Sequence, residues 1–521
     1  MLFAEQFVTM PWPHSYAVFL IALIPAMILA VILHETGHVI AARCVGIRVL
    51  AWGVGMRRPW FSFSVDNSIF YFGRPFSSGL TLPAKTTFER ESTKELLLIL
   101  GGPLASILGL SVGLAAWWLG ARSNVLTAWI AVSVLIVATS AIPFVMRSKG
   151  IQFGSDAYLL LRLLTPSRQH APLRLGHTLA SARALADLMS SVKSQLGRAI
   201  YHSQISILES VFGNVPAARE SLSIAQHNAL SHSEVTGLVA YAQALLAVKE
   251  NAEDVERVLH TARNLCRDDA TAKFWLDCLD EGLRLENGVG NGPRLNELRH
   301  EATKAGRTDW LFMVEMLEFE AEPQEDAEAQ CRDLLKRQAG QITTFDIARA
   351  LAITTERLAA RGNVSRARDL FAKAQAAITD EASTIASVET RDAYIRAASA
   401  PLQRAIALTA EGVPLFIPQP VSEETSQLVA FANATLVSGV VAMISGLIGW
   451  SIRRGWIPDG PHNTLIADSS IAIIGVSFLL ALLLGIFSIV RRERRWWRLL
   501  IGLGLAMLAA RLIASIVGLE N

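Results

Sequence analysis

The chain reads AMILAVILHETGHVIA from residue 26 to residue 41, and this stretch decides how the rest of the molecule is organised. It places His34 and His38 four residues apart, so that in a helix both imidazoles lie on one face and can hold one metal ion, with Glu35 beside them. Residues 7–33 contain no Asp, Glu, Lys or Arg, which is enough to cross a bilayer that needs about 20 apolar residues. Because ionisable groups at membrane depth are costly and usually functional, the two histidines indicate a metal site rather than side chains that only fill space.

The composition indicates a mixture of membrane and soluble segments. The chain has 521 residues, of which 51% are hydrophobic and 18% are charged, too apolar for a soluble protein and too charged for one that lies in the membrane throughout. This length suggests two or three structural units. The net charge of +2 gives no argument for a nucleic acid partner. The four cysteines have neither C-x-x-C spacing nor the pattern of a small disulfide framework, so we expect free thiols in a reducing compartment.

The distribution of charge predicts how the first spans cross the membrane. Eight basic residues follow the histidines, and the positive-inside rule places this loop in the cytoplasm and the amino terminus outside. They are Arg43, Arg48, Arg57, Arg58, Arg74, Lys85, Arg90 and Lys94. The next uncharged stretches, 96–120 and 123–146, are separated by two residues and predict a tight helical hairpin through the membrane. The first 15 residues lack the basic region of a signal peptide, so we expect the first span to be kept as an anchor.

Two short segments of the basic loop predict a β-hairpin. Residues 61–65 alternate apolar and small polar side chains, Asp66 and Asn67 supply turn chemistry, and residues 68–72 form the returning strand. The hairpin either packs as a small sheet on the protein or works as an edge that pairs with an extended substrate. In the second case Phe70 and Phe72 are the candidate substrate-binding side chains.

Two further segments bear on the site. The second span contains Gly-Gly-Pro-Leu-Ala-Ser at 101–106, whose small residues allow close helix packing and whose proline can kink the helix. After the third span comes Gly154-Ser155-Asp156, at the cytoplasmic level of the histidines. A catalytic zinc takes three protein ligands and an open position for water, and two histidines with one carboxylate are a known set. From its spacing alone, Asp156 is equally a third ligand or the N-cap of a helix.

Together these residues resemble the site-2 protease family of intramembrane zinc metalloproteases. The resemblance covers residues 16–162 and follows the family's order: His-Glu-Thr-Gly-His in the first core span, a cytoplasmic hairpin loop, Gly-Gly-Pro-Leu-Ala-Ser in the second span, and Pro143 followed by Ser-Asp after the third. It implies that His34, His38 and Asp156 bind zinc and that Glu35 is the general base. It also implies a hydrolase for regulated intramembrane proteolysis, whose substrate is a transmembrane helix of another membrane protein.

The chain departs from the family pattern at three positions. The family usually has Asn where this chain has Ser106 and Ser140, and Gly where it has Ala157. These departures concern how the substrate backbone is held, which makes Ser106 and Ser140 candidate substrate-binding residues. The separation of Pro143 and Asp156 is also longer than in the commonest form of the family. The alternative function is a catalytically weak or inactive membrane scaffold that acts through its helical-repeat domain.

Residues 166–411 have the charge and the helical periodicity of a soluble helical domain. Gly-Asn-Val-Pro-Ala-Ala-Arg-Glu at 213–220, with Ala225, recurs as Gly-Asn-Val-Ser-Arg-Ala-Arg-Asp at 362–369, with Ala374, and a weaker copy runs from 250 to 262. Small residues at fixed points of paired helices resemble degenerate tetratricopeptide repeats, which stack into a solenoid with a concave binding face. A generic helical bundle is the alternative. The first interpretation predicts a protein partner or regulator on this domain.

The last part of the chain predicts three more spans, at 425–451, 469–490 and 499–519, after a proline linker. Basic and aromatic residues at 491–498 suit a cytoplasmic membrane interface. The expected fold is mainly α: a polytopic protein of the cell (inner) membrane, with a small cytoplasmic β-hairpin and a soluble helical-repeat domain. Its three units are a metalloprotease core at 1–165, a cytoplasmic helical domain at 166–411 and a carboxy-terminal bundle at 412–521.

Overall fold

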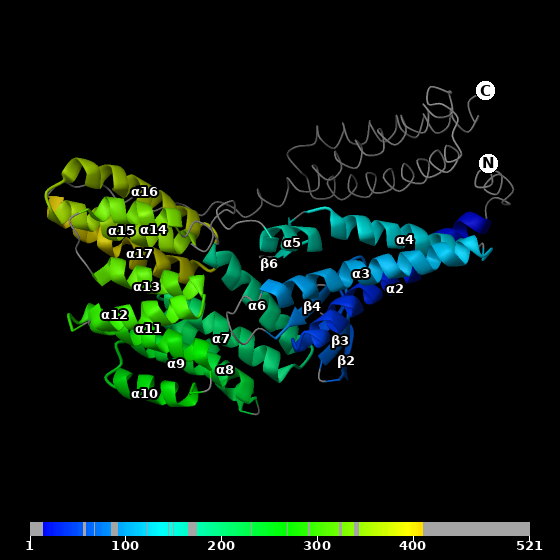
Figure 1. The fold of residues 1–521 in the computed structure, drawn as a ribbon, viewed down its shortest axis with the longest axis horizontal. Coiled ribbons are helices and arrows are strands. Elements are labelled where there is room, and N and C mark those ends of the chain that lie inside the picture. The colour runs from blue at the N-terminus through cyan, green and yellow to red at the C-terminus, as the bar shows by residue number, and fades with distance from the viewer. Residues whose placement is uncertain are drawn as a thin grey trace, which may run out of the picture.

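The computed structural model describes residues 14–55, 59–66, 68–84, 92–121, 123–143, 145–148, 151–164, 174–230, 232–267, 269–289, 292–321, 326–337 and 343–409. Within these residues the protein has sixteen α-helices, one 3-10 helix and two small β-sheets, which confirms a mainly helical fold (Figure 1). The predicted carboxy-terminal bundle at 412–521, with its three spans and the basic cluster 491–498, lies outside the described residues.

Among the described residues, three helices are long and apolar enough to cross a membrane, as the charge-free stretches predict. They are α2 (His14–Cys44), α3 (Ser92–Trp118) and α4 (Asn124–Ala141). The three pack against one another, and α3 and α4 form the expected hairpin. Small residues of α2, such as Ala26 and Ala30, are buried against α4, whereas Leu29 and Leu108 point outward and are exposed. Apolar side chains that face outward are what a lipid environment requires.

Glycines allow α2 and α3 to cross at very short range. A Cβ atom added to Gly37 would lie 2.2 Å from the carbonyl oxygen of Gly101, and one added to Gly101 would lie 2.4 Å from that of Gly37. The two backbones are therefore in direct contact just beside the histidines. This is the close packing that the small-residue segment 101–106 predicts.

A four-stranded sheet lies in the loop between α2 and α3. Its strands are β1 (Val49–Val54), β2 (Phe61–Val65), β3 (Ser68–Phe72) and β4 (Gly79–Pro83), in the order β2-β3-β1-β4. The predicted hairpin is confirmed as β2 and β3, which pair antiparallel from Val65 and Ser68 to Phe61 and Phe72. Asp66 turns the chain with a positive φ of 45°, and Asn67 lies outside the described residues. Two strands were not predicted from the sequence, β1 and β4. The strand β1 runs parallel to β3, and β4 pairs antiparallel with β1.

The two faces of this sheet pack on different parts of the molecule. One face contacts the membrane helices, through Trp52, Val54 and Phe72. The opposite face carries Ala51, Tyr71 and Leu82, which share one buried core with helices of the following domain, including Leu179. The sheet therefore lies between the membrane core and the helical domain (Figure 1).

A second, two-stranded sheet explains the long separation of Pro143 and Asp156. It consists of β5 (Val145–Ser148) and β6 (Ile151–Gly154), an antiparallel hairpin inserted after α4. The strand β6 leads directly into α5 (Asp156–Leu164). The extra residues thus form a defined connection that ends at the predicted third ligand.

The helical domain follows, and its elements fall within the predicted range 166–411. They are α6 (Leu175–Ser191), α7 (Gln195–Val211), α8 (Val215–Ala229), a 3-10 helix (Ser233–Val235), α9 (Thr236–Lys249), α10 (Val255–Leu265), α11 (Ala270–Glu286), α12 (Gly292–Lys304), α13 (Thr308–Ala321), α14 (Ala327–Arg337), α15 (Thr344–Ala360), α16 (Val364–Ala382) and α17 (Val388–Thr409). Consecutive helices pack on each other in pairs, among which α7 with α8 and α15 with α16 are extensive.

The two clear sequence copies in this domain adopt the same local structure. Gly213 and Gly362 have positive φ angles of 78° and 73° and end the preceding helices, and the next helices begin two residues later. Their repeated alanines, Ala218, Ala225, Ala367 and Ala374, are all buried. The copies are thus equivalent structural units, while the tetratricopeptide-like identity stays a prediction.

The first two helices of the domain, α6 and α7, also contact the last two, α16 and α17. The side-chain amide of Asn214 donates to Thr390 Oγ1 at 3.0 Å, and the Thr390 hydroxyl donates to Glu209 Oε2 at 3.0 Å. The backbone N–H of Gly176 donates to Glu381 Oε1 at 2.7 Å. In an open solenoid each repeat contacts only its neighbours, so these bonds are additional to simple stacking. They close the domain on itself.

Candidate metal centre and active site

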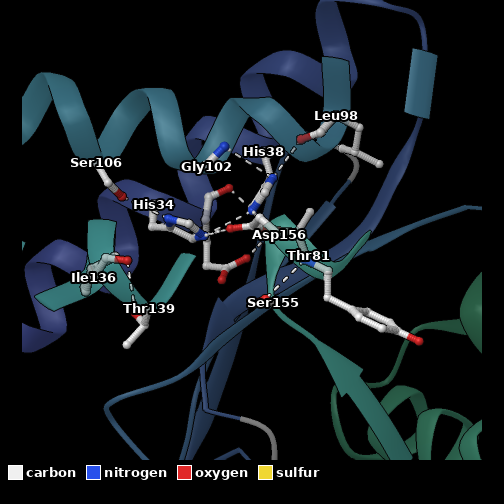
Figure 2. A network of polar contacts seen from close by, with 12 residues as sticks. His34, His38, Thr81, Leu98, Gly102, Ser106, Ile136, Thr139, Ser155 and Asp156 are labelled. Atoms are coloured by element: carbon white, nitrogen blue, oxygen red, sulfur yellow. Dashed lines mark hydrogen bonds and ion pairs between the residues drawn. The ribbon is translucent and has the colours of Figure 1, made fainter. Parts of the chain in front are cut away.

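Three side chains from two distant parts of the chain meet where α2, α3 and α5 converge (Figure 2). Nε2 of His34 lies 3.2 Å from Nε2 of His38. Asp156 approaches from the other side, with Oδ2 at 3.1 Å from His34 Nε2 and Oδ1 at 3.5 Å from His38 Nε2. One potential ligand atom from each residue thus points at a common centre.

These atoms are close enough together to hold one metal ion such as zinc. Zinc bonds to nitrogen and oxygen are about 2.0–2.1 Å long, which puts neighbouring tetrahedral ligands about 3.3–3.4 Å apart. The two Nε2 atoms are 3.2 Å apart, close to this value, and each lies 3.1 or 3.5 Å from a different oxygen of the Asp156 carboxylate. One ligand atom from each of the three residues lies within 4.8 Å of the others. Three protein ligands also leave a fourth position for water or substrate, as in catalytic zinc sites. His34, His38 and Asp156 are therefore suited to hold the metal.

Each histidine is oriented through its other ring nitrogen. His38 Nδ1 donates to the carbonyl oxygen of Leu98 at 2.7 Å, since a carbonyl can only accept. The backbone N–H of Gly102, 3.3 Å from the same nitrogen, is then a neighbour rather than a donor to it. His34 Nδ1 lies 2.9 Å from Ser106 Oγ. Such partners fix the ring and leave Nε2 to the metal.

The position of Asp156 depends on the residue before it. Ser155 Oγ accepts the backbone N–H of Tyr158 at 3.3 Å and donates to the carbonyl oxygen of Ile142 at 2.7 Å. Ser155 therefore caps α5 and ties its start to the end of α4. Asp156 is the first residue of α5, and its carboxylate faces the histidines instead of capping the helix. Of the two interpretations left open by the sequence, the geometry favours the ligand.

Glu35 lies next to the metal group and is held by β4. Its side chain is buried, and Thr81 donates from Oγ1 to Glu35 Oε2 at 2.6 Å. A Cβ atom added to Gly79 would lie 2.4 Å from Glu35 Oε1, so the glycine leaves room for the second carboxylate oxygen. One strand thus both fixes and accommodates this carboxylate.

Gly102 of α3 keeps open the space beside the ligand nitrogens. A Cβ atom added there would lie 2.3 Å from His38 Nε2 and 2.7 Å from His34 Nε2. A side chain at this position would collide with the candidate ligand nitrogens themselves. The second Gly of the Gly-Gly-Pro segment is therefore required by the site as well as by the helix crossing.

Comparison with known proteins identifies the family. The profile of peptidase family M50 matches residues 22–489, a range that contains all four groups of the site. The chain belongs to peptidase family M50. This confirms the resemblance to site-2 proteases and makes the chain a membrane metalloprotease at the level of the family. No match was found among the curated proteins or among the solved structures.

The M50 fold separates the predicted substrate-binding residues. Ser106 contacts His34, and Ser140 is buried in α4 without a hydrogen bond to the metal group in the described part of the chain. Phe70 and Phe72 lie on β3, which is paired on both sides, and their rings pack against Trp52 and Phe61 respectively. A substrate role for these four residues stays a prediction.

Sequence reasoning missed Thr81, Gly79 and the carbonyl oxygen of Leu98. The apolar residues Leu80 and Leu82 alternate with Thr81, a period-two signal that could have identified β4 in this M50 chain. Leu98 contributes a backbone atom, for which a side-chain pattern gives no signal.

Proposed function

We propose that the protein is an intramembrane zinc metalloprotease that hydrolyses a transmembrane segment of another membrane protein. The observation that carries this proposal is the convergence of His34, His38 and Asp156 within reach of one metal ion, near the end of a helix apolar enough to cross a membrane. Membership of family M50 supports the protease activity.

The reacting groups follow from this arrangement. His34, His38 and Asp156 would hold the zinc ion, which when bound would supply Lewis acidity and make the attacking water more acidic. Glu35 accepts the proton of the attacking water and passes it to the leaving amine, as a general base and then a general acid. Its burial beside the ligands, with one oxygen held by Thr81, supports this role.

The substrate segment has to be unwound before it is cut, because a helix uses its carbonyl groups in its own hydrogen bonds. An extended segment can pair with the edge of a sheet. In the described residues β4 pairs with β1 on one side, and its residues Gly79 and Thr81 adjoin Glu35. We therefore assign the pairing edge to β4, whereas β2 is the other edge of the sheet.

We also propose a membrane orientation for the chain and a protein partner for its helical domain. The basic loop after α2 favours a cytoplasmic sheet and helical domain, with the amino terminus outside and the chain crossing the cell (inner) membrane several times. The helical domain offers a surface for a protein partner or regulator. The near-zero net charge gives no support for a nucleic acid partner.

Quantitative proteomics of membranes tests the function. Cells carrying the full chain are compared with cells carrying Glu35→Gln, which spares the metal ligands and removes the base. Single-pass proteins or their membrane stubs that accumulate only with Glu35→Gln establish proteolysis and give substrate candidates. Identical membranes, together with an effect of deleting the whole chain, would instead support the scaffold that acts through its helical domain.

A further inference from the structure

We propose that Thr81 is the positioning residue of the general base, and that the helical domain sets its place through the opposite face of the same strand. This inference rests on the proposed function, because it takes Glu35 as the base. It gives the helical domain a role inside the active site, in addition to any role in binding a partner.

The strand β4 contacts the carboxylate of Glu35 directly. Thr81 Oγ1 lies 2.6 Å from Glu35 Oε2 and 3.4 Å from the Glu35 backbone oxygen, so this hydroxyl is the group that fixes one carboxylate oxygen. The absence of a side chain at Gly79 leaves space at Oε1. The carboxylate is thereby held in one orientation, with its other oxygen available to a reacting water.

The side chains of β4 alternate between the two faces of the sheet. Successive residues of a strand point to opposite faces, so Gly79 and Thr81 share one face and Leu80 and Leu82 share the other. The register agrees, since Leu82 pairs with Ala51 and both are buried in the core of the helical domain. Leu80 packs against the same core. A single strand therefore contacts the base on one side and the helical domain on the other.

Further contacts join the sheet to that domain. Arg48, just before β1, forms an ion pair with Glu234 of the 3-10 helix. Tyr71 is fully buried in the shared core, and its hydroxyl donates to the carbonyl oxygen of Gly55 at 3.0 Å. The helix α6 also packs on β6, the strand that leads into Asp156. Both the residue that holds the base and the segment that carries the third ligand thus adjoin the helical domain.

A change in the packing of the helical domain can therefore alter the reaction rate through the position of Glu35. Displacing a reacting group by about 1 Å can lower a rate by about 100-fold. A change in the packing of the helical domain that moves Leu80 and Leu82 moves Thr81 on the same strand, and with it Glu35. The proposed ligands His34 and His38 are on α2 and are oriented by α3, so their positions do not depend on the contact through β4.

The hydroxyl is tested first, with Thr81→Val and Thr81→Ser in the zinc-loaded full chain in proteoliposomes. The probe is a quenched fluorescent peptide with one transmembrane helix. We expect Thr81→Val to lower kcat about tenfold or more, with KM and zinc content unchanged. Thr81→Ser keeps the hydroxyl and should restore kcat to within about threefold of the original chain.

A second readout does not depend on cleavage. The Glu35 carboxylate is labelled with a carbodiimide and a small amine at a fixed pH, and the labelled fraction is measured by mass spectrometry. The labelling rate should change at least threefold in Thr81→Val and not in Thr81→Ser. A purely structural role of the side chain predicts the opposite order, because Val keeps the shape of Thr whereas Ser loses its methyl group.

The helical domain is tested with Leu82→Ala, and with Leu82→Val as a milder variant. Their control is Leu259→Ala, which removes an equally buried leucine from a separate cluster of the helical domain. We expect Leu82→Ala to lower kcat with zinc retained, and Leu259→Ala to leave kcat unchanged. In the Thr81→Val background Leu82→Ala should add little, since both act on the same contact.

The outcomes separate this inference from the proposed function. If Glu35→Gln is inactive while Thr81→Val keeps full kcat, the function stands and the role of Thr81 is wrong. If Leu82→Ala and the control Leu259→Ala lower kcat equally, the proposed connection from the helical domain through β4 to Glu35 is wrong. If Glu35→Gln keeps full activity, the assignment of Glu35 as the general base is wrong. If, in addition, the labelling rate of Glu35 is unchanged in Thr81→Val, the proposed contact between Thr81 and Glu35 is also wrong.

Discussion

At the candidate metal centre, each histidine has partners at both ring nitrogens. The Nε2 atoms of His34 and His38 face Asp156, while their Nδ1 atoms face Ser106 Oγ and the carbonyl oxygen of Leu98. The outer contacts fix the rings before any metal arrives. Preformed sites of this kind lose less conformational entropy when they bind their ligand.

The ligand set predicts how metal content responds to substitution. His34→Ala and Asp156→Ala should each lose most of the bound zinc, because each removes one of three protein ligands. Glu35→Gln should keep it, since Glu35 is held by Thr81 and does not belong to the converging group. Atomic emission analysis of the purified full chains measures this, and unchanged zinc in either ligand variant removes that residue from the set.

Ser106 is predicted to act on the metal rather than on the substrate. Ser106→Ala removes the partner of His34 Nδ1 and should weaken zinc affinity about 10–100-fold, the usual cost of losing an outer hydrogen bond. Competition with a chelator measures the affinity. Ser111→Ala, an exposed serine on the same helix, is the matched control. A higher KM with unchanged zinc affinity would return Ser106 to the substrate-binding role that the family comparison suggests.

Three of the four residues of the candidate site could be placed together from the sequence alone. His34, Glu35 and His38 are close in sequence, so helical periodicity was enough to place them together. Asp156 needed the resemblance to the family, because spacing alone could not exclude an N-cap. The contacts of Ser106 and Thr81 depend on how α3 and β4 pack on α2, and that packing is set by residues far apart in the chain.

Among the elements, α5 is held at its first turn by Ser155. Ser155→Ala loses the bond from the Tyr158 N–H and the bond to the Ile142 carbonyl, which should cost about 1 kcal/mol of helix stability. Because Asp156 is the next residue, we expect zinc affinity to fall several-fold, as measured by chelator competition. Ser123→Ala removes the equivalent cap of α4, away from the site, and should leave the affinity unchanged. Equal losses in both variants would argue for a general loss of stability.

The elements found from sequence are those with a local signal. Charge-free length identified α2, α3 and α4, and alternation with turn residues identified the hairpin of β2 and β3. The strand β1 was missed because it is buried on both sides and follows α2 closely, so its apolar residues show no alternation. Its parallel pairing with β3 is a non-local contact that no short sequence window contains.

At the scale of the whole molecule, closure of the helical domain is predicted to depend on pH. Burial raises the pKa of Glu381 from its ordinary value of 4.5 to about 7, although the Gly176 N–H, Thr384 and Arg174 favour the charged form. The folded domain therefore prefers the protonated carboxyl. Its free energy of unfolding should fall as the pH rises from about 4.5 to about 7, by up to about 3 kcal/mol.

Hydrogen exchange of α6 and α16 in the full chain, corrected for the intrinsic pH effect, measures this dependence. Glu381→Gln cannot titrate and should remove the slope. Glu356→Gln, which alters an ion pair with Arg404 at the surface, should keep it. A slope that survives Glu381→Gln would assign the pH dependence to another group.

The placement of the sheet between two cores limits how this protein can be divided. Removing the helical domain would expose Tyr71 and Leu82, both buried in the intact chain, on a continuous apolar face. Exposed faces of this kind promote aggregation. The protease core is thus not a portable module to which different soluble domains can be fused. An exchange of domains between relatives would have to transfer the sheet residues together with the helices that cover them.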